Sequence, residues 1–291
     1  METTSHPRSG LADRIRRGLG DCTPAERKVG RVLLSAYPSA GFETVAVLAA
    51  RAGVSGPTVV RFVARLGFTG FPDFQAALRA DLDDRSASPL ALYETRDVAA
   101  TSGTEDALAR YAPAAVRAVQ HTFDRLPPSD VARTVELLAH EGRRVLVVGG
   151  RFSRLLGLYL VQHLQQMRPD VEFVSDRPEW RANAFTDLHH RDVLVVFDYR
   201  RYEQESLTLA QFAADRKASI VLFTDAWLSP VASLADAVLP SDTGSSSPYD
   251  TMAPAMAVVE AVVSGVLTAR GPDAHHRMEQ IEATGTSLGI L

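Results

Sequence analysis

Hydrophobic residues recur at helical spacing over the first eighty residues and then gather into short continuous runs in the second half of the chain. In the first part, this period predicts helices over 11–19, 24–36 and 73–82, with two further helices between the last two. In the second part, helices over 107–123 and 129–140 precede five apolar runs. Helical patterns separate most of these runs, which lie at 144–148, 171–174, 193–197, 219–223 and 237–239. Uninterrupted Val and Leu runs are typical of parallel strands covered on both faces.

These patterns predict two domains of different class. We expect an all-α domain over 1–82, a linker over 83–105 that is polar, small and contains a proline, and a three-layer α/β domain with a parallel sheet over 106–270. Residues 271–291 have a weak pattern and are expected to form a tail. In a parallel sheet, ligands bind outside the carboxyl ends of the strands. The loops 149–153, 198–203, 224–230 and 241–250 are therefore the places to look for a site.

Residues 44–71 predict a helix-turn-helix. Gly53 stands where the turn requires a positive φ, which glycine adopts without steric cost. Ser55 is placed to cap the second helix, and Pro57 lies in its first turn, where a missing N–H costs nothing. The apolar face of the second helix is expected to be Val59, Phe62, Val63 and Leu66.

The opposite face of this second helix carries Thr58, Arg61 and Arg65. Such a face is typical of a recognition helix in the major groove of DNA. We expect Thr58 and Arg61 to read bases, and Ser55 and Arg65 to contact phosphates or adjacent base edges. An ordinary helical hairpin with solvated arginines fits the same pattern.

The distribution of charge favours the DNA-binding alternative. Residues 1–80 hold eleven Lys and Arg against six Asp and Glu, a net charge of +5, whereas residues 81–291 hold 20 against 29, a net charge of −9. A basic first domain beside an acidic second one indicates that the first domain meets phosphates.

Two stretches carry a family resemblance. The first comprises the helix opening Thr23-Pro24-Ala25-Glu26-Arg27 and, after it, Ser55-Gly56-Pro57-Thr58-Val59-Val60-Arg61-Phe62 followed by Leu66-Gly67-Phe68-Thr69-Gly70-Phe71. These motifs resemble the N-terminal domain of RpiR-type transcriptional regulators. Residues from about 106 to 270 resemble the sugar isomerase (SIS) domain that these regulators carry. The resemblance implies a dimeric or tetrameric regulator of double-stranded operator DNA that senses a phosphosugar or a related anion.

The loops expected to hold the effector depart from the family pattern. In the first loop, Gly150 and Ser153 fit a phosphate cradle, but Arg151 replaces a second glycine. In the second, the usual two hydroxyls and glycine are replaced, and the loop carries Asp198, Arg200 and Arg201. Two hydroxyls of a later loop, Ser245 and Ser246, are expected at the same edge of the sheet and complete the candidate effector residues.

Three explanations fit this altered loop. Arg200 and Arg201 bind an anion through charge-assisted contacts, the ligand has changed to a carboxylate or a polar metabolite, or the loop binds nothing and its arginines pair with acids at a dimer interface. The third explanation describes a DNA-binding protein whose SIS dimer is purely structural.

An enzyme of the same fold, a sugar-phosphate isomerase or lyase, is a further alternative, because His163, His189 and His190 offer possible bases. Their spacing does not predict a metal site, and Gly149-Gly150 is not part of a dinucleotide-binding motif. We therefore expect no catalytic residues, metal or cofactor. The single Cys22, the polar stretch 1–10 and the absence of an apolar run of spanning length predict a cytoplasmic protein without a membrane partner.

Overall fold

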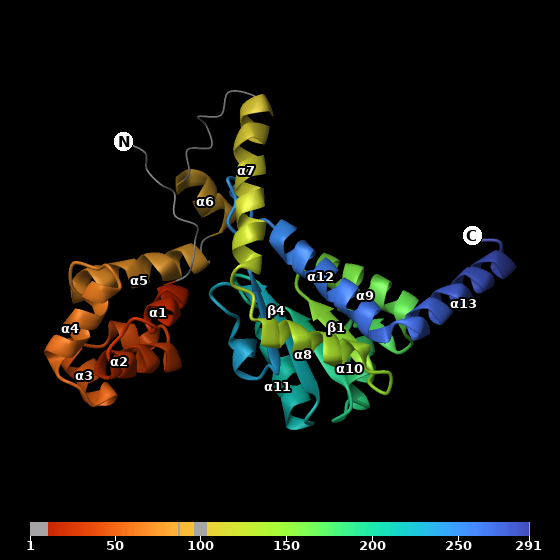
Figure 1. The fold of residues 1–291 in the computed structure, drawn as a ribbon, viewed down its shortest axis with the longest axis horizontal. Coiled ribbons are helices and arrows are strands. Elements are labelled where there is room, and N and C mark those ends of the chain that lie inside the picture. The colour runs from red at the N-terminus through yellow and green to blue at the C-terminus, as the bar shows by residue number, and fades with distance from the viewer. Residues whose placement is uncertain (1–10, 87, 96–103, 291) are drawn as a thin grey trace. The chain divides into compact units, whose positions relative to one another are not determined.

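The computed structural model describes residues 11–86, 88–95 and 104–290, and the chain divides into two compact units, Met1–Arg96 and Asp97–Leu291 (Figure 1). The division falls inside the segment 83–105 expected to be a linker. Each unit has a hydrophobic core of its own.

The first unit is built of helices only among its described residues. Its elements are α1 Leu11–Gly18, α2 Pro24–Ser35, the 3₁₀ turn η1 Ser39–Phe42, α3 Val45–Ala52, α4 Gly56–Arg65, α5 Phe71–Ser86 and α6 Pro89–Thr95. The predicted start of α2 is confirmed: the Thr23 hydroxyl accepts a hydrogen bond from the Glu26 backbone N–H, and the Glu26 carboxylate accepts one from the Thr23 backbone N–H.

The helix-turn-helix is formed by α3 and α4, whose axes bend by 98°. Gly53 ends α3 in the left-handed region with φ 61°, as the sequence predicts. Phe62 of α4 is fully buried, and Phe68 and Phe74 pack edge to face in the same core. These contacts fix α4 on the body of the unit and decide which of its faces points outward.

The second unit holds one parallel five-stranded sheet in the order β2-β1-β3-β4-β5. Its elements are α7 Thr104–Phe123, α8 Pro128–Ala139, β1 Val145–Gly149, α9 Arg154–Met167, β2 Val171–Phe173, α10 Pro178–Thr186, β3 Val193–Phe197, α11 Gln204–Asp215, β4 Ser219–Asp225, the 3₁₀ turn η3 Pro230–Ser233, β5 Ala237–Ser241, α12 Ala253–Arg270 and α13 Pro272–Leu288. All five predicted strands are confirmed within two residues at each end. The predicted α plus α/β class is confirmed too.

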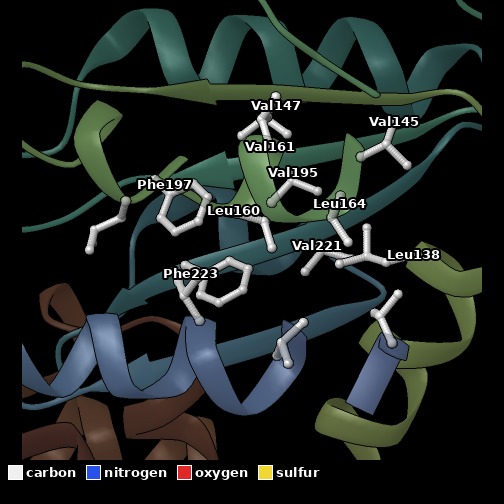
Figure 2. Close-up of a cluster of buried hydrophobic side chains, with 14 of the residues drawn as sticks. Leu138, Val145, Val147, Leu160, Val161, Leu164, Val195, Phe197, Val221 and Phe223 are labelled. Atoms are coloured by element: carbon white, nitrogen blue, oxygen red, sulfur yellow. The ribbon is translucent and has the colours of Figure 1, made fainter. Parts of the chain in front are cut away.

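Helices cover both faces of this sheet. One face packs on α8, α9 and α12 through alternate strand residues such as Val147, Val195 and Phe223, which Figure 2 shows beside Leu160 and Leu164 of α9. The other face packs on α10 and α11 through the intervening strand residues. Because the central strand β3 is buried on both sides, its sequence is apolar throughout, whereas the edge strand β2 carries the exposed Glu172.

Two expectations about the ends of the domains are wrong. The segment 83–105 is not all linker, since α5 continues to Ser86 and α6 occupies Pro89–Thr95. The weakly patterned tail forms α13, which packs against α9 and buries Ala274. Few of the α13 residues are apolar, so the pattern alone did not reveal the helix.

The expectation that no apolar run reaches spanning length is also wrong. By length and composition α12 is apolar enough to cross a membrane, with 18 residues of mean hydropathy 1.3, although it includes Glu260. In the structure it packs against α8 and α9 through Val258, Val259 and Val262, as a core helix does.

Candidate functional site

The exposed face of α4 is the first candidate site. Pro57, Val60, Arg61, Ala64 and Arg65 are exposed, and their spacing of three and four residues places them on one side of the helix. The opposite side, with Val59, Phe62 and Val63, is buried. The predicted positions of Arg61 and Arg65 on the exposed face are confirmed.

The predicted position of Thr58 on that face is wrong, because its side chain is only 6% exposed. Its hydroxyl lies 3.0 Å from the Ser55 hydroxyl and accepts a hydrogen bond from an Arg61 NH2 group at 3.1 Å. Ser55 occupies the N-cap position as expected, but its side chain makes no capping hydrogen bond. The buried Thr58 hydroxyl therefore orients the guanidinium of the exposed Arg61.

Arg65 is tied to the first turn of α2. Its Nε lies 3.3 Å from Oε2 of Glu26, whose side chain is only 4% exposed. The hydrogen bond from the Thr23 backbone N–H, joined by the Thr23 hydroxyl and the charge of Arg65, lowers the pKa of Glu26. A carboxylate held ionised in this way restrains Arg65, and sequence reasoning did not identify this partner.

The second candidate site lies at the carboxyl edge of the sheet. β1 and β3 are neighbours, while the chain passes from β1 to β2 on one side and from β3 to β4 on the other, so their ends form the topological switch point. The Ser153 hydroxyl joins the two loops there: it accepts a hydrogen bond from Gly150 N–H at 3.0 Å and donates one to the carbonyl of Phe197 at 2.8 Å.

Asp198, at the end of β3, is buried among hydrogen-bond donors. Its carboxylate accepts bonds from the Ser229 hydroxyl and from Glu203 N–H. Burial raises the pKa of Asp198, and the hydrogen bond from Ser229 opposes this shift. Asp198 thus joins the loop after β3 to the loop after β4.

Arg200 connects the same loop to the segment that follows β5. Its guanidinium forms a two-pronged ion pair with Asp250, at 3.0 Å from Nε to Oδ2 and 2.7 Å from Nη2 to Oδ1, and its side chain is 2% exposed. The Tyr202 hydroxyl donates to Asp225 at 2.6 Å. The four loops predicted from the strand ends are therefore brought together by side-chain contacts.

Other candidate residues lie at the rim of this cluster. Arg151 is exposed, with its guanidinium 5.2 Å from the centre of the Phe152 ring. Arg201 is also exposed and has a left-handed backbone, with φ 75°. Glu203 lies so close to Gly150 that a Cβ on this glycine would be 2.5 Å from Oε1 of Glu203.

The two hydroxyl candidates of the last loop differ in exposure. Ser246 is exposed, whereas Ser245 is half-buried and accepts a hydrogen bond from Ser247 N–H. Beside this loop, His121 of α7 lies 3.2 Å from Asp242. Sequence reasoning missed His121 at this edge, because α7 precedes the sheet by many residues; Glu203 and Asp225 lie in the predicted loops but were given no role.

The histidines considered as bases lie elsewhere. His189 contacts Asp192, which directly precedes β3 and so belongs to the amino edge of the sheet, and His163 packs on Tyr159 within α9. Within the described ranges, no group of three or more His, Cys, Asp or Glu side chains is arranged to hold a metal ion.

Comparison with known proteins supports the fold class of both units. Residues 9–85 match the family model of the helix-turn-helix domain of the rpiR family, and residues 137–265 match that of the SIS domain. The chain belongs to the RpiR family of transcriptional regulators. Both predicted halves of the resemblance, and the predicted role as a regulator, are confirmed.

Relatives of this RpiR-family chain align over nearly its whole length. The HTH-type transcriptional regulator HexR of Pseudomonas aeruginosa is 27% identical, covering 94% of each chain, and HexR of Escherichia coli is 24% identical, covering 94% of this chain and 93% of its own. Among solved structures, the Vibrio vulnificus NanR protein complexed with ManNAc-6P has a TM-score of 0.54 at 21% identity and covers 96% of this chain and 98% of its own. That likeness establishes a shared fold.

Proposed function

We propose that this RpiR-family regulator binds double-stranded operator DNA through the exposed face of α4, and that an anionic metabolite at the carboxyl edge of the sheet changes this binding. The observation that carries the DNA-binding half is Arg61. It is exposed on the recognition helix and is oriented by Thr58, in a domain whose residues 1–80 carry a net charge of +5. A guanidinium in this position matches the bidentate acceptors of guanine in the major groove.

The effector half rests on the switch-point loops. Arg151 and Arg201 are exposed cations beside the joined ends of β1 and β3, and Ser246 is an exposed hydroxyl of the neighbouring loop. We propose a phosphosugar or a related anion as ligand, which the ManNAc-6P complex of the NanR relative supports. Ser153, Asp198 and Arg200 are engaged with the protein itself, so we assign them to the shape of the loops.

The proposal includes a symmetric assembly and a location. A homodimer or homotetramer presents two recognition helices to half-sites one helical turn apart, about 34–36 Å. An effector then acts by binding one arrangement of the two helices more tightly than another. Because the partner is chromosomal DNA, we place the protein in the cytoplasm.

We propose a regulator without enzymatic activity. Isomerase chemistry needs a positioned base at the substrate, and His189 lies at the opposite edge of the sheet from the candidate effector site. At the carboxyl edge, Glu203 and His121 are the glutamate and histidine that an isomerase could use as a base. Absence of turnover of a bound phosphosugar supports the proposal, and turnover that is lost in Glu203→Gln or His121→Asn contradicts it.

The DNA-binding half is tested by capture of fragmented genomic DNA with the full-length protein at a stated salt concentration, followed by sequencing. A few enriched sites with a shared palindromic sequence support the proposal, and uniform recovery of the genome contradicts it. The neighbouring genes then identify the pathway of the effector.

The effector half is tested by thermal stabilisation with inorganic phosphate and N-acetylmannosamine 6-phosphate. We expect a rise in the melting temperature that Arg201→Ala reduces. Arg216→Ala is a matched control, because Arg216 is exposed at the other end of α11. Equal responses of the two variants would remove Arg201 from the site.

A further inference from the structure

We infer that Val60 is a base-reading residue that recognises the C5-methyl group of a thymine beside the base contacted by Arg61. The inference rests on the proposed DNA-binding function and adds a sequence preference to it. Sequence reasoning assigned Val60 no role, because it looked for polar and charged side chains on the exposed face.

The position of Val60 separates it from the core of its unit. Val59 and Val63, on the same helix, are fully buried, whereas Val60 is 43% exposed. A single exposed valine needs no explanation in itself. What singles out Val60 is its place next to Arg61, on the face that the fold of the helix-turn-helix turns outward.

The rest of this face allows a close approach to DNA. Pro57 and Ala64 are seven residues apart on α4 and form its outermost line, with Val60 and Arg61 on either side of that line. Pro57 and Ala64 have short side chains, so the edges of bases can come near the helix backbone. Thr58, which carries the only hydroxyl of α4, is buried and turned toward Arg61.

The chemistry of the two exposed side chains is complementary. In the major groove, thymine is distinguished by its methyl group, which apolar side chains contact, and guanine by its two acceptors, which arginine contacts. Arg65 is restrained by Glu26, so the pair available for direct readout consists of Val60 and Arg61. The exposed face therefore predicts a half-site in which a guanine and a thymine are neighbours or nearly so.

The experiment uses a duplex recovered by the full-length protein from a random DNA pool. In this duplex each thymine of one half-site is replaced in turn by uracil, which lacks only the methyl group. We expect one replacement to weaken binding of the native protein about three- to fivefold, the effect of losing one buried methyl group. Val60→Ala is expected to bind the thymine and uracil duplexes equally.

Val47→Ala is the matched control, because Val47 is also a half-exposed valine, 47% exposed, on the neighbouring helix α3. It is expected to keep the preference for thymine. The inference is overturned if no uracil replacement weakens binding, or if Val60→Ala keeps the same penalty at the same base. Failure to recover any duplex from the pool contradicts the proposed DNA binding itself, so the two failures are distinguishable.

Discussion

Arginines in the two units of the molecule are used in opposite ways. On α4, Arg61 is exposed, and its guanidinium donates a hydrogen bond to a neutral hydroxyl, that of Thr58. At the carboxyl edge of the sheet, Arg200 is 2% exposed and forms a two-pronged ion pair with Asp250. A guanidinium bound only to a neutral group keeps its charge for a phosphate or a base. One bound to a carboxylate is neutralised within the protein.

This difference separates binding residues from residues that shape a site. A count of charged residues gives every arginine the same weight. Only arginines without a buried carboxylate partner contribute their full charge to the attraction of an anion. Arg65 is intermediate: it is 45% exposed, yet it contacts Glu26.

The largest effect is expected from breaking the pair at the carboxyl edge. Asp250→Ala leaves the buried Arg200 guanidinium without its carboxylate, and such losses cost about 3–5 kcal/mol. Unfolding in denaturant, followed by a signal from the second unit, measures this cost. The control is Asp176→Ala, which removes the partner of Arg154 from a pair that is 43% and 73% exposed. We expect about 0–1 kcal/mol there, and equal losses in both variants would contradict the buried role of Arg200.

Removal of Arg61 is expected to weaken binding to the selected operator by about 1–3 kcal/mol and to relax sequence discrimination at one base pair. The comparison variant is Arg79→Ala, which removes the same charge from an exposed position on α5. Titration of both variants with specific and scrambled duplexes distinguishes readout from general attraction. A loss that is uniform across sequences would assign Arg61 to a phosphate.

A smaller effect is expected from Glu26→Gln, which weakens the capping box of α2 and the contact with Arg65, at a cost of about 1 kcal/mol. The pKa of Glu26 is lowered in the folded protein, mainly by the Thr23 backbone hydrogen bond. Ionised Glu26 therefore stabilises the fold above its ordinary pKa, and this contribution disappears as the pH falls through the lowered value.

The corresponding measurement is the difference in unfolding free energy between the native protein and Glu26→Gln as a function of pH. We expect it to be constant near neutrality and to shrink in acid. A difference independent of pH would mean that the charge of Glu26 does not contribute. Release of Arg65 is also expected to make DNA binding more sensitive to salt, because one more cation can meet a phosphate.

The smallest effect is expected from Asp198→Asn. Burial raises the pKa of Asp198, so the folded protein holds its proton more tightly than the unfolded chain does. Stability of the native protein therefore falls as the pH rises from the ordinary pKa of an aspartate through the raised value. The Asn variant lacks this decline, and parallel pH profiles of the two proteins would contradict it.

Much of the fold could be predicted from the sequence because the period of apolar residues is strong. Continuous runs such as 193–197 define strands, and Gly53 with Ser55 and Pro57 defines the turn between α3 and α4. The helix α13 was missed because its apolar residues are few. The face of Thr58 was misjudged because a polar residue near the edge of an apolar stripe can be buried when neighbouring side chains satisfy its hydroxyl.

The site was predictable only as far as the ends of the strands. Their order along the chain indicates which loops share an edge, and this placement is confirmed by contacts such as Ser153 with Phe197. The pairing of Arg200 with Asp250 spans fifty residues of sequence, and that of Asp198 with Ser229 spans 31. The pattern of residues near one position in the sequence carries no information on partners this far away. The sequence therefore could not distinguish arginines paired within the protein from arginines able to bind a ligand.

Arg201 combines a charge at the rim of the site with a strained turn. A backbone with φ 75° is comfortable for glycine and costs an arginine about 1–2 kcal/mol, yet the turn between β3 and α11 adopts it. The strain belongs to the main chain, so replacing Arg201 with another L-residue changes the side chain and leaves the strain in place, whereas glycine removes both. The charge of this rim can therefore be altered without altering the conformational cost of the turn.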